Sequence, residues 1–271
     1  MMPAAKAIQS LQNPTVKYLL KLQEKSAFRK SENKFVVEGV REIQLALKGN
    51  YHIEKLLYCP HLAGDAILKI RNSLPKAIWL EVSLAVYQKL AYRDSTEGVM
   101  ALVASKNTHL DALVFKTKTP LVLVIESPEK PGNLGAILRT ADAAQVDAVI
   151  VADPRTDWFN PNVIRSSVGT VFTNQLAAAG TEDIITFLKD KEIKIFAAEL
   201  NASKNYHEQD YTGASAIVLG TEATGLTAPW LEAADQNIII PMRGKIDSLN
   251  LAISASIIVF EAKRQRGFAW G

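Results

Sequence analysis

The sequence predicts an α/β protein made of a smaller N-terminal unit and a larger C-terminal unit. Short strand-like runs alternate with amphipathic helical patterns along the 271 residues, which is typical of α/β folds. Residues 121–125 are apolar throughout, as expected for a central strand covered on both faces. A polar stretch precedes them. We therefore divide the chain into residues 1–106, a linker over 107–119 and residues 120–271.

The N-terminal unit is expected to begin with a basic helix. Asn13 followed by Pro14 is typical of a helix start, because Asn caps free amide groups and Pro fits the first turn. Val16, Leu19 and Leu20 then repeat at helical spacing. Beyond this helix we expect strands over 35–37, 55–58, 77–80 and 99–104, and helices over 40–47, 65–72 and 84–90.

The C-terminal unit is expected to continue the alternation. Asn133 occupies an N-cap position, so we expect a helix from about residue 134. A last helix is expected over 249–265, because Asp247 and Ser248 precede it and Gly267 follows it. That helix is apolar nearly all round, so we expect it to be buried. The strands are expected over 121–125, 148–151, 193–197, 216–219 and 237–240.

Positive charge is concentrated at both ends of the chain. Residues 1–50 hold nine Lys or Arg against four Asp or Glu, and residues 241–271 hold five against two. Clustered positive charge attracts phosphate backbones, and an unevenly charged, solvated surface is the ordinary alternative. Two interpretations of the first helix therefore stay open, an RNA-gripping helix or a solvated lid, and both concern Lys17, Lys21, Lys25, Arg29 and Lys30.

Several classes of site and location are disfavoured. Cys59 is the only cysteine, which excludes a disulfide within the chain and fits the reducing cytoplasm, where we expect the protein. The sequence shows neither an apolar secretory leader nor a run long enough to span a bilayer, so we expect no membrane contact. It has no dinucleotide or nucleotide phosphate loop and no nucleophile elbow, and its four histidines are scattered. We expect neither a metal nor a covalent nucleophile.

Three loops at predicted strand ends carry the polar residues that remain. Such loops form the ligand crevice of open α/β sheets. Arg139, beyond the first loop, points away from the apolar stripe of its helix. Each loop alone has an ordinary explanation. In the first, Arg139 would pair with Asp142 or face solvent. The second would be a plain turn around Gly220 and Gly225, and the third a polar connection over 240–250.

Taken together, the three loops resemble a known family. The sequence reads N-L-G-A-I-L-R-T-A over 133–141, L-G-T-E-x-x-G-L over 219–226 and I-P-M-x-G-x-x-x-S-L-N over 240–250. This order and spacing is similar to that of the SpoU (TrmH-type) RNA ribose methyltransferases, across residues 120–266. Residues 35–39 resemble, more weakly, the start of that family's ribosomal-protein-like RNA-binding domain. Lys130 departs from the acidic residue that many members have there, and indicates a changed loop or RNA contact.

The resemblance implies a fold and a cofactor. In this family the C-terminal segment of the α/β sheet is threaded into a deep trefoil knot, a rare exception to the usual topology rules. The implied cofactor is S-adenosylmethionine, held bent in the knot, largely by backbone groups of the second and third loops. The positions that match cofactor contacts are Gly220, Ile240, Leu249, Leu219 and Met242.

The resemblance also implies a catalytic set, formed by Asn133, Arg139, Glu222, Ser248 and Asn250. The implied reaction is methyl transfer to a ribose 2′-hydroxyl, which must be held in line and lose its proton. Because a guanidinium stays protonated, we favour Arg139 as the group that binds an RNA phosphate and the ribose oxygen over a role as base. Asn133, Ser248 and Asn250 would orient the hydroxyl. Glu222 would either fix Arg139 or shape the cofactor loop.

The implied partners are a structured RNA and a second copy of the chain. A separate N-terminal RNA-binding unit favours ribosomal RNA over transfer RNA. Family members are typically homodimers whose RNA site is built across two knotted domains. The alternative is an RNA-binding protein of ribosome assembly with a vestigial site, which would be expected to have lost one or more of the catalytic residues.

Overall fold

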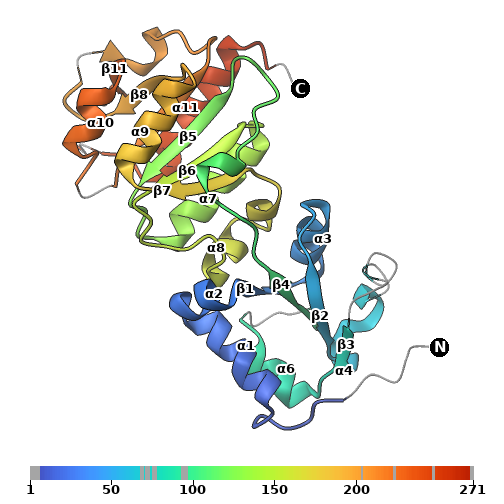
Figure 1. The fold of residues 1–271 in the computed structure, drawn as a ribbon. Helices are drawn as coiled ribbons and strands as arrows, with labels where there is room; N and C mark the ends of the chain where they lie inside the picture. The colour runs from blue at the N-terminus through green and yellow to red at the C-terminus, as the bar shows by residue number, and fades with distance from the viewer. Residues whose placement is uncertain are drawn as a thin grey trace. The chain divides into compact units, whose positions relative to one another are not determined.

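The computed structural model describes residues 7–67, 70, 74, 78–92, 97–202, 204–221, 224–245 and 248–268, and Figure 1 traces the chain. The predicted α/β class is confirmed. Two compact units are formed, one by Met1–Lys106 with Asp157–Thr173 and the other by Asn107–Thr156 with Asn174–Gly271. No helix among the described residues combines the length and the apolarity that crossing a membrane requires.

The N-terminal unit contains a four-stranded sheet with the order β1-β4-β2-β3. β4 runs antiparallel to both β1 and β2, whereas β2 and β3 are parallel. The predicted strands are confirmed as β1 (Lys34–Glu38), β2 (Ile53–Tyr58), β3 (Ile78–Glu81) and β4 (Val99–Ala104).

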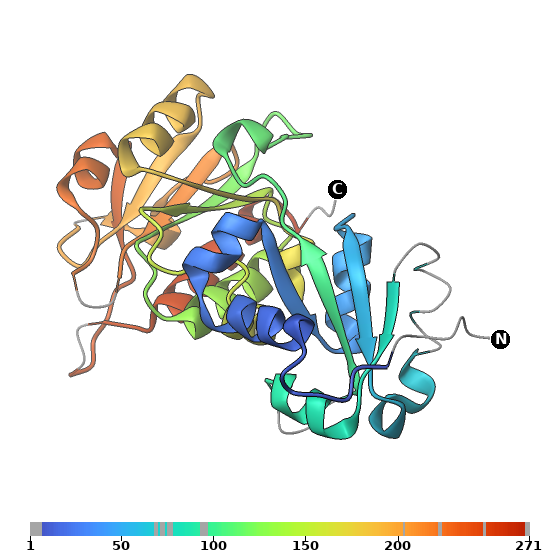
Figure 2. The ribbon, with the colours of Figure 1, turned by 60° about the horizontal axis from the view of Figure 1, so that its bottom comes forward.

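The first helix begins where the sequence indicates. The Asn13 side chain accepts a hydrogen bond of 2.8 Å from the backbone N–H of Thr15, and Pro14 occupies the first turn of α1 (Pro14–Glu24). α1 packs against β1 and α6, as Figure 2 shows. The described helices within the first 106 residues are α1, α2 (Ser26–Glu32), α3 (Val40–Lys48), α4 (Pro60–Ala63) and α6 (Leu84–Leu90). The 3-10 turn η1 (Gly64–Ile67) covers the start of the helix predicted over 65–72, Ile70 is helical, and residues 68, 69, 71 and 72 lie outside the described residues.

Residues 157–173 complete the core of the N-terminal unit, although the sequence analysis places them in the C-terminal one. Phe159 stacks on Phe35 with ring centroids 4.1 Å apart, and Phe172 lies 5.8 Å from the same ring. The segment contains α8 (Pro161–Ser166) and the 3-10 turn η3 (Thr170–Phe172). The chain therefore passes between the two units three times.

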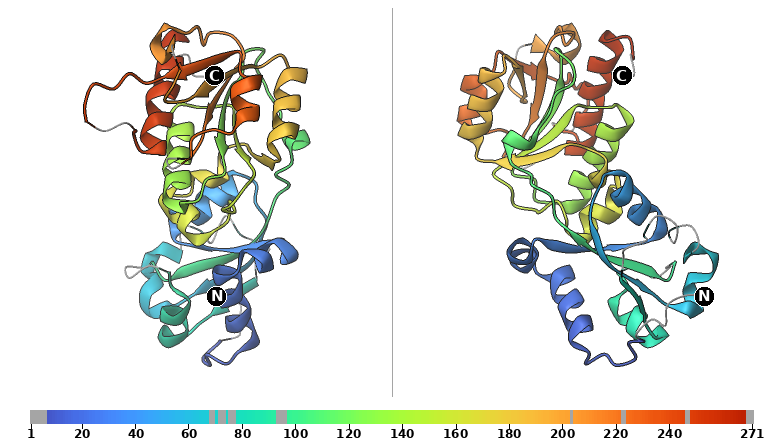
Figure 3. Two further views of the ribbon diagram at one scale, coloured as in Figure 1. Left: turned by 90° about the vertical axis from the view of Figure 1, so that its left-hand side faces the viewer. Right: turned by 45° about the vertical axis from the view of Figure 1, so that its right-hand side comes forward.

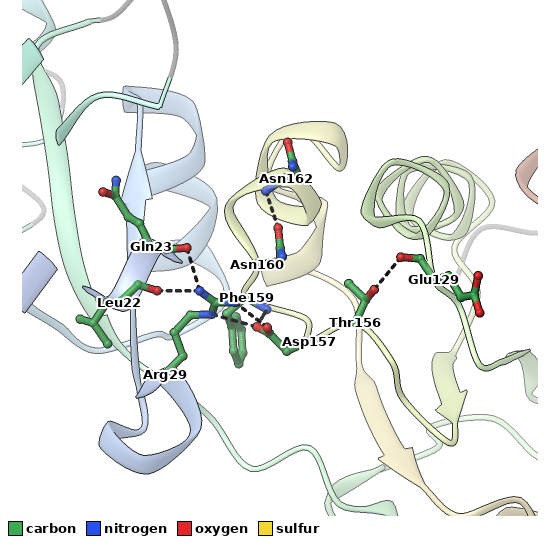
Figure 4. A network of polar contacts seen from close by, with 9 residues as sticks. All are labelled: Leu22, Gln23, Arg29, Glu129, Thr156, Asp157, Phe159, Asn160 and Asn162. Atoms are coloured by element: carbon green, nitrogen blue, oxygen red, sulfur yellow. Dashed lines mark hydrogen bonds and ion pairs between the residues drawn. The ribbon is translucent and has the colours of Figure 1, made fainter. Parts of the chain in front are cut away.

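A buried ion pair holds the start of the segment 157–173 to α2. Arg29 donates to both carboxylate oxygens of Asp157, at 3.1 and 2.6 Å, and its remaining donor reaches the carbonyls of Leu22 and Gln23. Figure 4 shows this network. The side chains of Arg29 and Asp157 are only 4% and 12% exposed. Such a pair needs its full set of partners, because burial removes both charges from water.

The C-terminal unit contains a seven-stranded parallel sheet with the order β7-β6-β5-β10-β8-β11-β9. The apolar run is confirmed as β5 (Leu121–Glu126), which is buried at every position and lies inside the sheet. The other predicted strands are confirmed as β6 (Ala148–Ala152), β8 (Lys194–Ala198), β10 (Ser215–Leu219) and β11 (Gln236–Ile239). The sequence analysis missed β7 (Leu176–Ala179), β9 (Lys204–Asn205), α9 (Thr181–Asp190) and α10 (Ala228–Ala233).

Two helix starts differ from the prediction. α7 (Pro131–Ala143) has Lys130 rather than Asn133 at its N-cap, because Pro131 fits the first position and needs no capping bond. α11 (Leu251–Gln265) is capped by Asn250, whose side chain accepts a hydrogen bond of 3.0 Å from Ala252. Asp247, which the prediction places before this helix, lies outside the described residues.

The prediction that the last helix is buried all round is wrong on one face. α11 packs against α7 and β10, and Figure 3 shows α7 and α11 side by side. Ala255, Ile258, Val259 and Ala262 are fully buried in that contact. On the other face Ile253 and Phe260 remain 52% and 40% exposed, because the outer face of a helix that covers a sheet is turned away from the core.

Candidate active site

A cavity of about 400 Å³ opens at the carboxyl ends of β8, β10 and β11. Its volume is in the range of small-molecule sites. The carboxyl ends of parallel strands meet at one edge of the sheet, so the loops that follow them converge there. The wall includes all five positions that the sequence analysis associates with a cofactor, namely Leu219, Gly220, Ile240, Met242 and Leu249.

Gly220 is required by the fold of the loop that follows β10. A Cβ atom at this position would lie 2.1 Å from the carbonyl carbon and oxygen of Gly225. Gly225 has a φ of +67°, and its N–H donates to the Thr221 carbonyl at 3.0 Å. The chain therefore folds back over Gly220, and the backbone itself forms this side of the cavity.

Glu126, the last residue of β5, anchors the far end of the same loop. Its side chain is 3% exposed. One carboxylate oxygen accepts from the backbone N–H of Thr227 at 2.9 Å, and the other accepts from the Thr227 hydroxyl at 2.6 Å. Hydrogen bonds to a charged group contribute about 1.5–3 kcal/mol each. Glu126 thus holds Thr227, and with it the end of the loop that begins at Gly220.

The polar network around Glu126 extends to two further elements. The Thr181 hydroxyl lies 3.5 Å from the Glu126 carboxylate and donates to Asp153 at 2.7 Å. The same hydroxyl accepts from the indole N–H of Trp230, which is fully buried, at 3.2 Å. The network therefore joins the ends of β5 and β6 to the starts of α9 and α10. A satisfied buried network of this kind gives the site a defined geometry.

Two amide side chains from the first and third loops meet. The Nδ2 of Asn250 donates to the Oδ1 of Asn133 at 3.2 Å. A second contact joins the same two helices, because the hydroxyls of Thr140 and Ser256 lie 2.8 Å apart. Asn133 is in the first turn of α7 and Asn250 caps α11, so the contact aligns the two helix starts. Ser248, two residues earlier, lines the cavity.

Arg139 lies on the exposed side of α7. It makes no hydrogen bond or ion pair with the residues that the structure describes, and in particular none with Asp142. Its guanidinium is available to a ligand at the surface. Glu222, the remaining member of the predicted catalytic set, lies outside the described residues.

The structure adds residues that sequence reasoning missed. Glu126 is the one charged residue of β5 and ends its otherwise apolar sequence, and this charge was a signal that the sequence offered. Thr227 looks like an ordinary loop residue in the sequence, because its partner is 101 positions away. Glu199 and Asn201, which follow β8, also line the cavity, and no pattern in the sequence marks them.

Known families match both parts of the chain. The profile of the SpoU rRNA Methylase family matches residues 120–260. The profile of the MRM3-like substrate binding domain matches residues 13–101. A relative from Bacillus subtilis, the 23S rRNA (guanosine(2553)-2'-O)-methyltransferase RlmP, is 29% identical over 258 residues, which cover 95% of this chain and 99% of the relative.

Solved structures resemble the whole chain. A crystal structure described as an RNA 2'-O ribose methyltransferase is 37% identical, covers 96% of this chain and 99% of its own, and superposes with a TM-score of 0.83. An AdoMet-bound rRNA methyltransferase from Sinorhizobium meliloti is 30% identical, covers 96% and 98% of the two chains, and gives a TM-score of 0.86.

Proposed function

Because the chain belongs to the SpoU rRNA methylase family, we propose that it transfers a methyl group from S-adenosylmethionine to a ribose 2′-hydroxyl of ribosomal RNA. The observation that carries the proposal is that residues of the second and third loops lie in the wall of one cavity. The names of the similar proteins support the same chemistry and favour ribosomal over transfer RNA as the substrate.

The cavity fits S-adenosylmethionine. Its volume suits a ligand of this size. The absence of a side chain at Gly220 lets the backbone of Gly225 pack against it, so backbone groups line the cavity there. The apolar side chains of Leu219, Ile240 and Leu249 would hold the adenosine portion. When bound, S-adenosylmethionine supplies a methyl group on a positively charged sulfur. The deep knot that the family resemblance implies remains a prediction.

We assign the binding of the RNA to Arg139. Its side chain is exposed and has no ion pair among the described residues. A guanidinium presents several donors in a fixed fork, and it stays protonated at neutral pH. Arg139 would therefore bind an RNA phosphate and the ribose oxygen and stabilise the negative charge that develops on that oxygen. A role as a proton-accepting base is disfavoured for the same reason.

The amides and Ser248 would position the ribose hydroxyl. Asn133 and Asn250 already contact each other at 3.2 Å, so little side-chain freedom is lost when the RNA binds. Holding a hydroxyl in line with the reacting carbon supplies a large part of the rate acceleration in such transfers. Ser248, in the cavity wall, would orient the hydroxyl from the cofactor side, and Glu222 would fix Arg139 or shape the cofactor loop.

The proposed assembly is a homodimer that uses the exposed face of α11. Ile253, Ile257 and Phe260 are spaced three or four residues apart and share one face of this helix. Ile253 and Phe260 are 52% and 40% exposed, and a second copy would cover them. Because α11 packs beside α7, the partner would approach the helix that carries Arg139. Light scattering that shows only monomer at micromolar concentration would contradict this assembly.

The protein is incubated with labelled S-adenosylmethionine and with ribosomal RNA purified from cells that lack this protein. Nucleoside analysis of the RNA then tests the reaction. We expect label in a 2′-O-methylated nucleoside, and label only in a methylated base would overturn the proposal. Arg139→Ala should lower turnover by at least about 100-fold with cofactor affinity unchanged within twofold. A protein that binds RNA but not S-adenosylmethionine would instead support the vestigial alternative.

A further inference from the structure

Glu199 is the only charged residue in the wall of the cavity, as far as the described residues extend. It directly follows β8 and is half-buried. Its backbone N–H donates to the Ile238 carbonyl at 3.0 Å, which fixes the chain at the cavity edge. Within the described residues its carboxylate has no hydrogen bond and no ion pair.

A partly buried carboxylate without donors is unfavourable, because it has lost part of its hydration without compensation. Most of the neighbouring wall consists of aliphatic side chains, backbone and the hydroxyls of Thr221 and Thr224, which hydrogen-bond to each other at 2.8 Å. Among the described residues the wall supplies no cation to Glu199. Hydroxyl groups of a ligand can therefore serve as the donors that this carboxylate lacks.

The strand order shows which part of the ligand Glu199 faces. β10 lies between β5 and β8, and neighbouring strands are about 4.8 Å apart. The end of β8 is therefore about 10 Å from the end of β5, and β5 leads into the helix that carries Asn133 and Arg139. With the catalytic roles proposed above, the transferred methyl group would lie toward those residues. Glu199 would then be near the part of the cofactor that is remote from the methyl group, which is the adenosine.

We propose that Glu199 binds the 2′- and 3′-hydroxyls of the cofactor ribose. The inference rests on the proposed function. Two carboxylate oxygens can accept from two neighbouring hydroxyls at once, and an acidic side chain at a strand end binds ribose in the same way in dinucleotide-binding sheets. Glu199 thereby makes the site specific for a ribonucleoside.

The test measures affinity by calorimetry with three probes. S-adenosylhomocysteine has both the ribose diol and the amino-acid group, 5′-methylthioadenosine has only the diol, and 2′,3′-dideoxy-S-adenosylhomocysteine has only the amino-acid group. Glu199→Ala should weaken binding of the first two by about 10- to 100-fold, and should bind the dideoxy probe as the native protein does. The control Glu232→Ala alters an exposed carboxylate of α10 outside the cavity wall and should leave all three affinities within twofold.

Glu199→Gln keeps the shape of the side chain and guards against misfolding. The native protein should distinguish S-adenosylhomocysteine from its dideoxy form by at least about tenfold, and Glu199→Gln should lose most of that distinction. Affinities of Glu199→Ala within twofold of native would overturn the assignment. So would a loss seen with S-adenosylhomocysteine but not with methylthioadenosine, since the carboxylate would then bind the amino-acid group. Failure of the native protein to bind any probe would instead overturn the proposed function itself.

Discussion

Replacing Asp157 by Ala should lower the free energy of unfolding of the N-terminal unit by about 3–5 kcal/mol. The substitution leaves the guanidinium of Arg29, which is 4% exposed, without its counter-charge. Two hydrogen bonds from Arg29, of 3.1 and 2.6 Å, are lost at the same time. The guanidinium of Arg29 keeps its hydrogen bonds to the carbonyls of Leu22 and Gln23. We therefore expect a loss of free energy near the lower end of the range of about 3–5 kcal/mol.

A matched control lies two residues away. Arg155 pairs with Glu129, and these side chains are 63% and 56% exposed. Arg155→Ala removes an ion pair from the surface, where water screens the charges, and should cost about 0–1 kcal/mol. Arg155 and Glu129 belong to the C-terminal unit, so the loss of stability is measured for each variant in the unit that holds its own pair. The difference between the two losses reports the effect of burial, because both variants break an arginine–carboxylate contact.

The assay is urea denaturation of the full chain combined with amide hydrogen exchange, followed at β1 and β4 for the N-terminal unit and at β5 and β6 for the C-terminal unit. With an m-value of about 2 kcal/mol/M, a loss of 3 kcal/mol moves the midpoint by about 1.5 M. The double variant Arg29→Met, Asp157→Leu should recover much of the loss, because an apolar pair avoids both desolvation costs. If Asp157→Ala destabilises the N-terminal unit no more than Arg155→Ala destabilises the C-terminal unit, the buried pair does not make the contribution to stability that its burial predicts.

Three further predictions concern the cofactor site and the RNA. Thr227→Val should lower the free energy of unfolding by about 1.5–3 kcal/mol, because the 2.6 Å hydrogen bond to Glu126 is lost. The control Thr186→Val, at an exposed helix position, should lower it far less, as measured by urea denaturation. Gly220→Ala should weaken S-adenosylhomocysteine binding at least about tenfold in calorimetry, because the methyl group meets backbone at 2.1 Å; Gly213→Ala has open space and should bind normally. Replacing Lys17, Lys21 and Lys25 by Gln should reduce the slope of log affinity for RNA against log salt by about one unit per lysine, and an unchanged slope would identify α1 as a solvated lid.

Local signals predicted most of the elements. Asn13 caps α1 through a bond to a residue two positions away, and the apolar run of β5 needs only burial on both faces. The cap depends on a neighbour in the sequence, and the strand depends only on the rule that apolar side chains are buried in a core. By contrast, Asn133 was assigned a capping role that Pro131 makes unnecessary, and its side chain instead contacts Asn250, 117 positions further on.

Long-range contacts explain what the sequence analysis missed. Residues 157–173 belong with the N-terminal unit because Phe159 and Phe172 stack on Phe35, more than 120 positions earlier. Their pattern of aromatic residues would suit a core in either unit. Glu126 and Thr227 contact each other only after β5 and its neighbours have assembled. The sequence therefore marks Glu126 only as a charge at the end of an apolar run, and it indicates nothing of its partner Thr227.

By itself the sequence determined the α/β class, most strands and the order of three loops that identify the family, since these depend on composition and periodicity along the chain. Only the tertiary structure decided that the second and third loops wall one cavity, and that Asn133 and Asn250 touch. The physical reason is strand order. Packing between distant segments places β10 between β5 and β8, and this order brings Gly220, Glu199 and Ser248 to one site.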